Sequence, residues 1–173
     1  MRGGKPEASW RVLVMGGGSI GKRHITNLLA LGVRQIVVCD PRPDRLQQVK
    51  AQCPVETVER LEQAWAAKPT VAVIAAPTSL HVPLALEAAE HGCHLFIEKP
   101  LSDRLNPDVD RLLALVRAQR LVTLIGCNMR FHPTLRHVKT LCDERAVGRI
   151  VAARVEAGQY LPSWRAGRDY RDS

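Results

Sequence analysis

Short apolar runs alternate along the chain with longer segments in which apolar residues recur every three or four positions. The first run, Arg11–Met15, is continuously apolar after its first residue, which is typical of a buried parallel strand. A segment with helical periodicity then reaches Leu31, and a second run with an apolar centre, Gln35–Asp40, ends in the acid Asp40. This order predicts a strand, a helix and a second strand in one βαβ unit.

The same alternation continues through the middle of the chain. Further strands are predicted at residues 55–57, 71–75, 95–97 and 122–127, and further helices at 43–52, 59–67, 80–91 and 106–119. Asn106 and Pro107 are expected to open the last of these helices as an N-cap and a first-turn proline. Strands that alternate with helices form a parallel sheet with right-handed crossovers, so the predicted fold class is α/β with a doubly wound sheet.

The pattern changes after Asn128. A helix is predicted at Pro133–Glu144, and it is followed by a long strand at 149–158 in which apolar and polar residues alternate. A period of two indicates a sheet with one buried face, so a domain of α+β type is expected to begin here. One strand cannot bury its own face, and we therefore expect this domain to be incomplete and the chain to be truncated. The expected parts are a tail at residues 1–9, an α/β domain at 10–127 and the start of a second domain at 128–173.

A glycine-rich turn joins the first strand to the first helix. Gly16, Gly18 and Gly21 have the spacing G-x-G-x-x-G, which is strong evidence only between a strand and a helix, with an acid about 20 residues further on. Gly16 allows the tight turn, Gly18 lets a pyrophosphate approach the backbone, and Gly21 lets the helix pack closely. Asp40 can accept hydrogen bonds from ribose hydroxyls. The prediction is a nicotinamide-dinucleotide site in a Rossmann domain, and the alternative is a structural glycine turn followed by an ordinary strand-end aspartate.

Composition and charge narrow the function classes. The longest apolar stretch is far too short for a membrane span, no secretory signal is visible, and five scattered cysteines without C-x-x-C favour reduced thiols in the cytoplasm. The net charge of +8 raises the question of nucleic-acid binding, but the basic residues are spread along the chain and only 4% of residues are aromatic. No specific nucleic-acid partner is therefore expected. No metal site is expected either, because His91, Cys93 and His94 straddle a helix end and a strand start.

Four motifs in order resemble those of the Gfo/Idh/MocA oxidoreductases, a family that includes glucose–fructose oxidoreductase and inositol dehydrogenase. They are G-x-G-x-x-G-x-x-H at 16–24, Ala-Pro-Thr-Ser-Leu-His at 76–81, Glu-Lys-Pro at 98–100 and Asn-Met-Arg-Phe-His-Pro at 128–133. The resemblance covers about residues 10–170. It implies a Rossmann domain that binds NAD, with NADP possible, and a larger domain that holds a sugar or cyclitol and mediates homo-oligomerisation. The family's late Asp-x-x-x-His segment, with its acid/base histidine, is absent from this sequence.

The resemblance places the cofactor contacts on the matched motifs and on the positions around them. The candidate residues are Gly16, Gly18, Ser19, Ile20, Gly21, Asp40, Arg42, Ala76, Pro77, Thr78, His81, Glu98, Lys99 and Asn128. Lys99 is the candidate catalytic residue, because alcohol oxidation needs a group that takes or polarises the hydroxyl proton, and a partly buried lysine near a cationic nicotinamide suits that role. The alternative is an ordinary lysine that pairs with Glu98. The resemblance also implies a cis Lys99–Pro100 peptide bond.

Several roles within this set stay open at the level of sequence. Asp40 favours NAD(H), because its carboxylate repels a 2′-phosphate, whereas Arg42 could pair with that phosphate. Thr78 and His81 are expected to touch the nicotinamide ribose or to line the substrate side, and His24 is either a packed helix residue or a ligand contact. The predicted function is NAD(P)-dependent hydride transfer to or from a sugar- or cyclitol-like carbinol. The alternative is a dinucleotide-binding module, or a truncated remnant, without turnover.

Overall fold

The computed structural model describes residues 10–104 and 107–158. The chain forms two compact units, Met1–Gly126 and Cys127–Ser173, and each is described by itself. The expected tail at residues 1–9, the Asn106 cap and the last part of the second domain, 159–173, lie outside the described residues.

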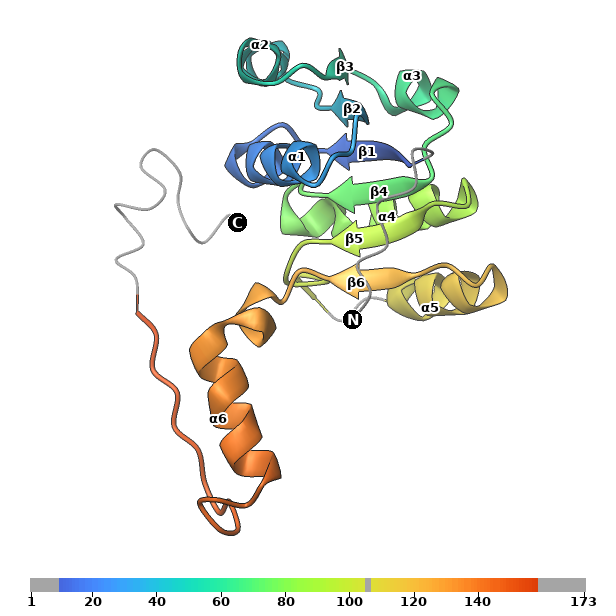
Figure 1. The fold of residues 1–173 in the computed structure, drawn as a ribbon. Helices are drawn as coiled ribbons and strands as arrows, with labels where there is room; N and C mark the ends of the chain where they lie inside the picture. The colour runs from blue at the N-terminus through green and yellow to red at the C-terminus, as the bar shows by residue number, and fades with distance from the viewer. Residues whose placement is uncertain (1–9, 105–106, 159–173) are drawn as a thin grey trace. The chain divides into compact units, whose positions relative to one another are not determined.

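Within the described residues, six parallel strands form one sheet in the order β3-β2-β1-β4-β5-β6 (Figure 1). The strands are β1 (Arg11–Met15), β2 (Gln35–Cys39), β3 (Glu56–Val58), β4 (Val71–Ile74), β5 (His94–Ile97) and β6 (Thr123–Ile125). β1 pairs with β2 on one side and with β4 on the other, so Val12 lies between Ile36 and Val71. The strand order reverses between β1 and β4, which is the switch point where doubly wound sheets bind ligands. The predicted α/β fold is confirmed.

Helices cover both faces of this sheet (Figure 1). They are α1 (Ser19–Ala30), α2 (Pro43–Gln52), α3 (Leu61–Ala66), the 3₁₀ turn η1 (Thr78–Leu80), α4 (His81–Glu90) and α5 (Asp108–Ala118). One core holds residues of α1 and α2, and the other holds residues of α3, α4 and α5. Along β1 the side chains alternate between them: Val12 and Val14 enter the first core, and Leu13 and Met15 enter the second.

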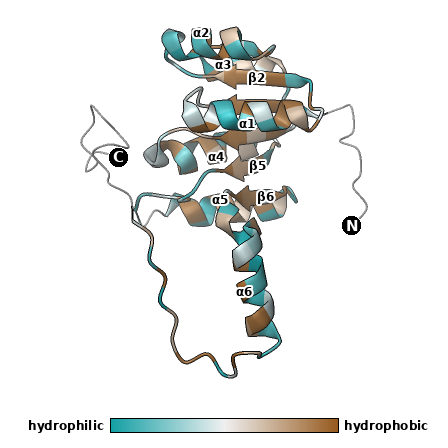
Figure 2. Cartoon of the chain, turned by 60° about the vertical axis from the view of Figure 1, so that its left-hand side comes forward, coloured by the Kyte–Doolittle hydropathy of each residue, from teal (hydrophilic) through white to brown (hydrophobic). Residues whose placement is uncertain are grey.

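The strands are buried on both faces, as their continuous apolar sequences predict. Figure 2 shows the sheet strands mainly in hydrophobic colours, whereas the helices carry both hydrophobic and hydrophilic residues. Ala85, Ala88 and Ala89 of α4 are fully buried, and their small side chains let this helix lie close to the sheet. All five cysteines are free. Burial raises the pKa of the Cys39 and Cys93 thiols to about 11, so these two are inert core residues.

The second unit contains the 3₁₀ turn η2 (Asn128–Phe131) and α6 (Pro133–Asp143) in its described part. The helix agrees with the prediction, but the strand expected at 149–158 is wrong, because the described residues form no strand there. Its apolar side chains are exposed, with Val151 at 82% and Val155 at 89%. The physical reason is that a strand needs a partner for its N–H and C=O groups, and an alternating sequence specifies a face without supplying that partner.

Candidate dinucleotide site

The glycine turn after β1 is held by close backbone contacts that exclude side chains. Gly16 has φ +109°, a conformation that L side chains rarely adopt, and a Cβ there would lie 2.6 Å from the Ala75 carbonyl oxygen. A Cβ at Gly21 would lie 1.8 Å from the Gly16 carbonyl oxygen. The Gly16 N–H donates to the Cys39 carbonyl oxygen at 2.8 Å, which ties the turn to the end of β2. The predicted roles of Gly16 in the turn and of Gly21 in close packing are confirmed.

The start of α1 is open toward the carboxyl end of the sheet. Gly18 is the N-cap residue without a side-chain capping bond, and a Cβ on it would meet no atom within 4 Å. The Lys22 N–H makes the first helical bond, to the Gly18 carbonyl oxygen, so the helix itself supplies no acceptor for the N–H groups of Ser19, Ile20 and Gly21. No acidic residue lies in this first turn. N–H groups without a helical acceptor and the positive end of the helix dipole form a position for a phosphate group.

Asp40 is placed beside this turn, but its carboxylate is buried, with 2% of the side chain exposed. Oδ2 accepts the Gly17 N–H at 2.8 Å and lies 3.3 Å from Arg45 Nη1, and Oδ1 accepts the Arg42 N–H at 2.9 Å. In this structure Asp40 therefore fastens the glycine turn to the start of α2. The contacts of Asp40 with Gly17 and Arg45 were not among the expected ones, which placed Asp40 at the adenosine ribose. The spacing of Arg45, five residues after Asp40 and on α2, was the available signal.

The guanidinium of Arg42 is occupied by an exposed carboxylate. Its Nη2 lies 2.6 Å from Asp44 Oδ2, and its Nε donates to Asp44 Oδ1 at 3.1 Å. The hydrogen bond between the two side chains lowers the pKa of Asp44 and raises the pKa of Arg42. An incoming 2′-phosphate would have to compete with Asp44 for this two-point contact.

The segment after β4 carries the second group of candidates. Ala76 and Thr78 are half-buried and Pro77 is exposed, so Pro77 and Thr78 lie at the surface where β4 ends. His81 differs from the expectation, because its ring is buried, with 1% of the residue exposed. Nδ1 lies 2.7 Å from the Pro100 carbonyl oxygen, and Nε2 lies 2.9 Å from the Ala76 carbonyl oxygen. His81 thus joins the loops after β4 and β5 instead of facing a ligand, because its position at the first turn of α4 directs it into the core.

Replacement of His81 by leucine should lower the free energy of unfolding by about 1–3 kcal/mol. A neutral imidazole has one N–H, so either the Ala76 or the Pro100 carbonyl oxygen loses its donor. Urea denaturation of H81L measures the change. The matched control is H137L, at an exposed position on α6, where the stability should stay within about 0.5 kcal/mol of wild type. An H81L protein as stable as wild type would contradict the structural role.

The loop after β5 holds the candidate catalytic residue. The Lys99–Pro100 peptide bond is cis, as the resemblance implied. A partly buried Lys99 was expected, but the residue is exposed, since it follows β5 at the carboxyl end of the sheet. The Glu98 carboxylate accepts the Lys99 backbone N–H at 3.2 Å and pairs with His24 Nε2 at 2.8 Å. Within the described residues, the Lys99 ammonium group forms no ion pair, so the simple Glu98–Lys99 side-chain pair is absent.

Asn128 is the one candidate that lies in the second unit. It begins η2 and is exposed. The remaining candidates belong to the first unit and follow the carboxyl ends of β1, β2, β4 and β5. The structure therefore brings together the glycine turn, Asp40, the loop at 76–78 and the loop at 98–100, as the strand-end rule predicts.

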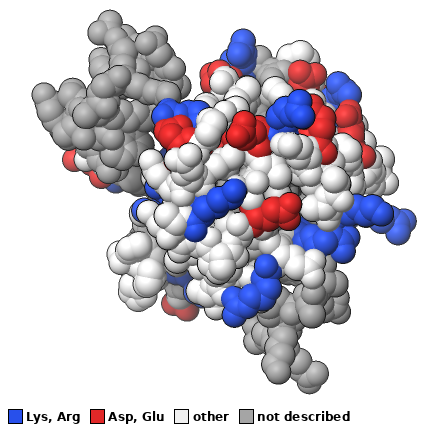
Figure 3. All heavy atoms as spheres, turned by 90° about the horizontal axis from the view of Figure 1, so that it is seen from above, with Lys and Arg blue, Asp and Glu red and all other residues white. Residues whose placement is uncertain are grey.

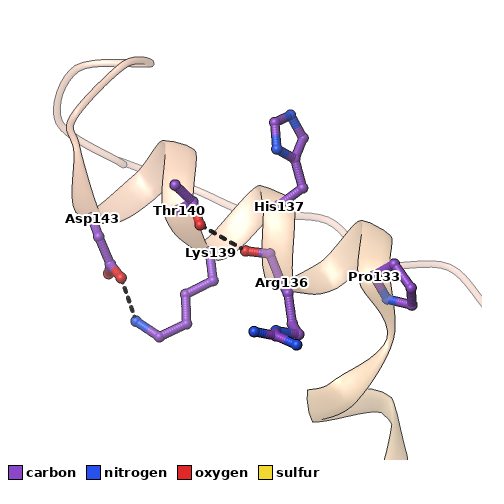
Figure 4. Close-up of a pocket in the computed structure, with 6 residues that line it drawn as sticks. All are labelled: Pro133, Arg136, His137, Lys139, Thr140 and Asp143. Carbon is purple, nitrogen blue, oxygen red and sulfur yellow. Dashed lines mark hydrogen bonds and ion pairs between the residues drawn. The ribbon is translucent and has the colours of Figure 1, made fainter. Parts of the chain in front are cut away.

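Charges on the surface are mixed in sign. On the face in Figure 3, lysine and arginine side chains are interspersed with aspartate and glutamate, and no continuous basic stripe crosses it. A hollow along α6 is lined by the side chains labelled in Figure 4, and its Lys139 is paired with Asp143 at 2.6 Å. All of its lining residues come from one exposed helix, so we do not assign it a ligand. In the part of the chain that the structure describes, the helices are too short or too polar to cross a membrane.

Comparison with known proteins agrees with this geometry. Residues 10–127 match the family of Gfo/Idh/MocA oxidoreductases, described as an oxidoreductase family with an NAD-binding Rossmann fold. Among curated proteins, the chain is 28% identical over 155 residues to myo-inositol 2-dehydrogenase of Thermotoga maritima, which covers 88% of this chain and 46% of that protein.

Among solved structures, the chain is likewise similar to dehydrogenases. Myo-inositol 2-dehydrogenase from Lactobacillus plantarum superposes with a TM-score of 0.75 at 25% identity, over 82% of this chain and 43% of the other. The WlbA dehydrogenase from Bordetella pertussis, solved in complex with NADH and UDP-GlcNAcA, superposes with a TM-score of 0.76 at 27% identity, over 83% and 42%. The chain spans less than half the length of each of these relatives.

Proposed function

The chain belongs to the Gfo/Idh/MocA oxidoreductase family, and from this premise we propose that it carries the nucleotide-binding part of an NAD-dependent dehydrogenase. The observation that carries the proposal is the open start of α1, where the glycine turn formed by Gly16 and Gly21 presents N–H groups without a helical acceptor beside Asp40. Residues at the ends of β4 and β5, from Ala76 to Thr78 and from Glu98 to Lys99, would hold the nicotinamide half. Asn128, in the second unit, is proposed as a further contact by the family resemblance alone.

Lys99 is proposed to act on the substrate hydroxyl. A bound nicotinamide supplies the hydride acceptor, and the exposed ammonium of Lys99 is free of ion pairs within the described residues. It can therefore polarise the hydroxyl group or take part in moving its proton. This role needs a substrate held close to the nicotinamide.

The substrate class is proposed to be a polyol or a sugar. The support is that two of the similar proteins are named for myo-inositol, and that a third was solved with a UDP-sugar.

We further propose that the protein works in the cytoplasm, where its free thiols stay reduced, and that it forms homo-oligomers through the second domain. The exposed apolar side chains of Val147, Val151 and Val155 in that unit support such a contact. No specific nucleic-acid partner, membrane partner or metal is proposed.

NADH should bind at least about tenfold more tightly than NADPH, a difference of about 1.4 kcal/mol. A 2′-phosphate would approach the buried carboxylate of Asp40, and Arg42 is already paired with Asp44. Isothermal titration calorimetry with each cofactor measures the two dissociation constants. Tighter binding of NADPH would show that Arg42 or Arg45 leaves its carboxylate for the phosphate.

The same samples distinguish an enzyme from a binding module. Cyclitols and sugar nucleotides are added with NAD⁺, and absorbance at 340 nm reports reduction of the cofactor. Substrate-dependent absorbance that disappears in K99M supports the dehydrogenase. Tight NADH binding without turnover on any substrate supports the second candidate, a dinucleotide-binding module, and failure to bind NADH would refute both.

A further inference from the structure

The Glu98 carboxylate lies where several elements meet at the carboxyl end of the sheet. The Glu98 N–H donates to the Ile74 carbonyl oxygen at 2.9 Å, which continues the pairing of β4 with β5 past the end of the strand. One carboxylate oxygen accepts the Lys99 N–H at 3.2 Å. A Cβ at Gly126, directly after β6, would lie 3.1 Å from the other oxygen. Gly126 therefore leaves the space that this carboxylate fills.

His24 reaches the same carboxylate from α1, the helix that begins at the glycine turn. Its Nε2 lies 2.8 Å from Glu98 Oε1, and each side chain is 19% exposed. The ring also packs edge-on against Phe96, with the ring centroids 4.9 Å apart, so its position over β5 is defined on two sides. An ionised carboxylate can only accept, so the bond requires a hydrogen on Nε2, and a short bond to a charged group is stronger than a neutral one.

The strand order places the ends of β1 and β2 on one side of the switch point and the ends of β4 and β5 on the other (Figure 1). The glycine turn and Asp40 place the pyrophosphate and the adenosine half beyond β1 and β2. The nicotinamide half then lies beyond β4 and β5, next to Pro77 and Lys99. The bond between His24 and Glu98 therefore connects the helix that receives the pyrophosphate to the strand end that receives the nicotinamide.

We propose that His24 is a positioning residue for the nicotinamide half of the cofactor. It holds the Glu98 carboxylate, which in turn fixes the backbone of Lys99, while it makes no contact with the adenosine half. Without this bond the carboxylate regains rotational freedom and the Lys99 segment loses a fixed acceptor, so the nicotinamide binds to a less ordered surface. The inference rests on the proposed function.

The test compares NADH with ADP-ribose, which lacks the nicotinamide. Wild type, H24L, H24Q and the control H94L are titrated with both ligands by calorimetry. H24L should weaken NADH binding by about tenfold, the size expected for the loss of one hydrogen bond to a charged group, and should leave ADP-ribose affinity within about twofold. H24Q should restore NADH affinity to within about threefold of wild type, because the glutamine amide can donate to Glu98. His94 is exposed at the opposite end of β5, so H94L should change neither affinity.

A spectroscopic readout follows the proposed link directly. The ¹H–¹⁵N resonance of the Lys99 amide should shift in H24L and return toward its wild-type position in H24Q, since this N–H donates to the Glu98 carboxylate. A change confined to folding stability would not produce this pattern of loss and rescue.

Different results would overturn the positioning role of His24 and the proposed function. Equal loss of NADH and ADP-ribose affinity in H24L, or no loss of either, overturns the positioning role. If H24L does not fold, E98Q is measured in its place, and an unchanged ratio of NADH to ADP-ribose affinity in E98Q overturns it as well. A wild-type protein that binds neither ligand refutes the proposed function itself, and this inference falls with it.

Discussion

G18V should lose NADH affinity by at least about 100-fold, or about 2.7 kcal/mol, while the protein stays folded. A Cβ at Gly18 meets no protein atom within 4 Å, and its φ of −70° and ψ of −171° suit a β-branched residue, so the substitution does not strain the turn. The new methyl groups would occupy the open space before α1, where the pyrophosphate must approach the backbone. The stability cost should be about 1 kcal/mol, since valine is a poor N-cap.

Fluorescence energy transfer from tryptophan to NADH measures the affinity of G18V, and circular dichroism checks the fold. The control is G158V, at an exposed glycine of the second unit where a Cβ also meets nothing within 4 Å. It should bind NADH as wild type does. A folded G18V protein with unchanged affinity would remove the glycine turn from the cofactor site.

G21A should be destabilised by about 3 kcal/mol or more and should also fail to bind NADH. Alanine normally stabilises a helix relative to glycine by about 0.5–1 kcal/mol. Here its Cβ would lie 1.8 Å from the Gly16 carbonyl oxygen, a distance that real Cβ atoms do not show, and the atom in the way is backbone. Either α1 or the turn must move, and both hold the phosphate position. The overlap should therefore outweigh the helix propensity.

Urea denaturation of G21A gives the stability change, and G18A is the matched control, because it makes the same substitution three residues away in open space. G18A should cost only about 1 kcal/mol, as G18V does, because alanine is also a poor N-cap, and this is well below the loss expected for G21A. If G21A were instead more stable than wild type, helix propensity would dominate and the close contact between Gly21 and Gly16 would not exist in solution.

The positions of the strands and helices followed closely from local patterns in the first unit. β1 and α2 have the bounds that the sequence predicted, and the other elements, β2 among them, shift by one or two residues at their ends. Periodicity works here because each strand is buried on both faces and each helix on one face. The strand expected at 149–158 failed for a related reason: its pattern specified a buried face, but the pairing partner is a long-range requirement that no local pattern contains.

The sequence predicted which residues lie near the strand ends better than it predicted which of their side chains are buried. Asp40, His81 and Lys99 all lie near the end of a strand, as expected, yet two of them point into the protein and the third is exposed. Which way a side chain turns at a strand end depends on the groups that reach it from other elements. The Asp40 carboxylate meets the Gly17 N–H from the glycine turn, and the His81 ring meets the Pro100 carbonyl oxygen from the loop after β5.

The amino-acid sequence by itself determined the α/β class, the glycine turn and the family, because each depends on residue types at short, fixed spacings. Only the tertiary structure decided the pairing of His24 with Glu98, which are 74 residues apart. It also decided that the Asp40 carboxylate is buried in contact with the Gly17 N–H and the Arg45 guanidinium. The physical reason is that a hydrogen bond between distant residues exists only once the strand order has brought α1 to the end of β5 and α2 to the end of β2. The spacing between Asp40 and Arg45 allowed their contact without specifying it, and the spacing between His24 and Glu98 gave no indication of theirs.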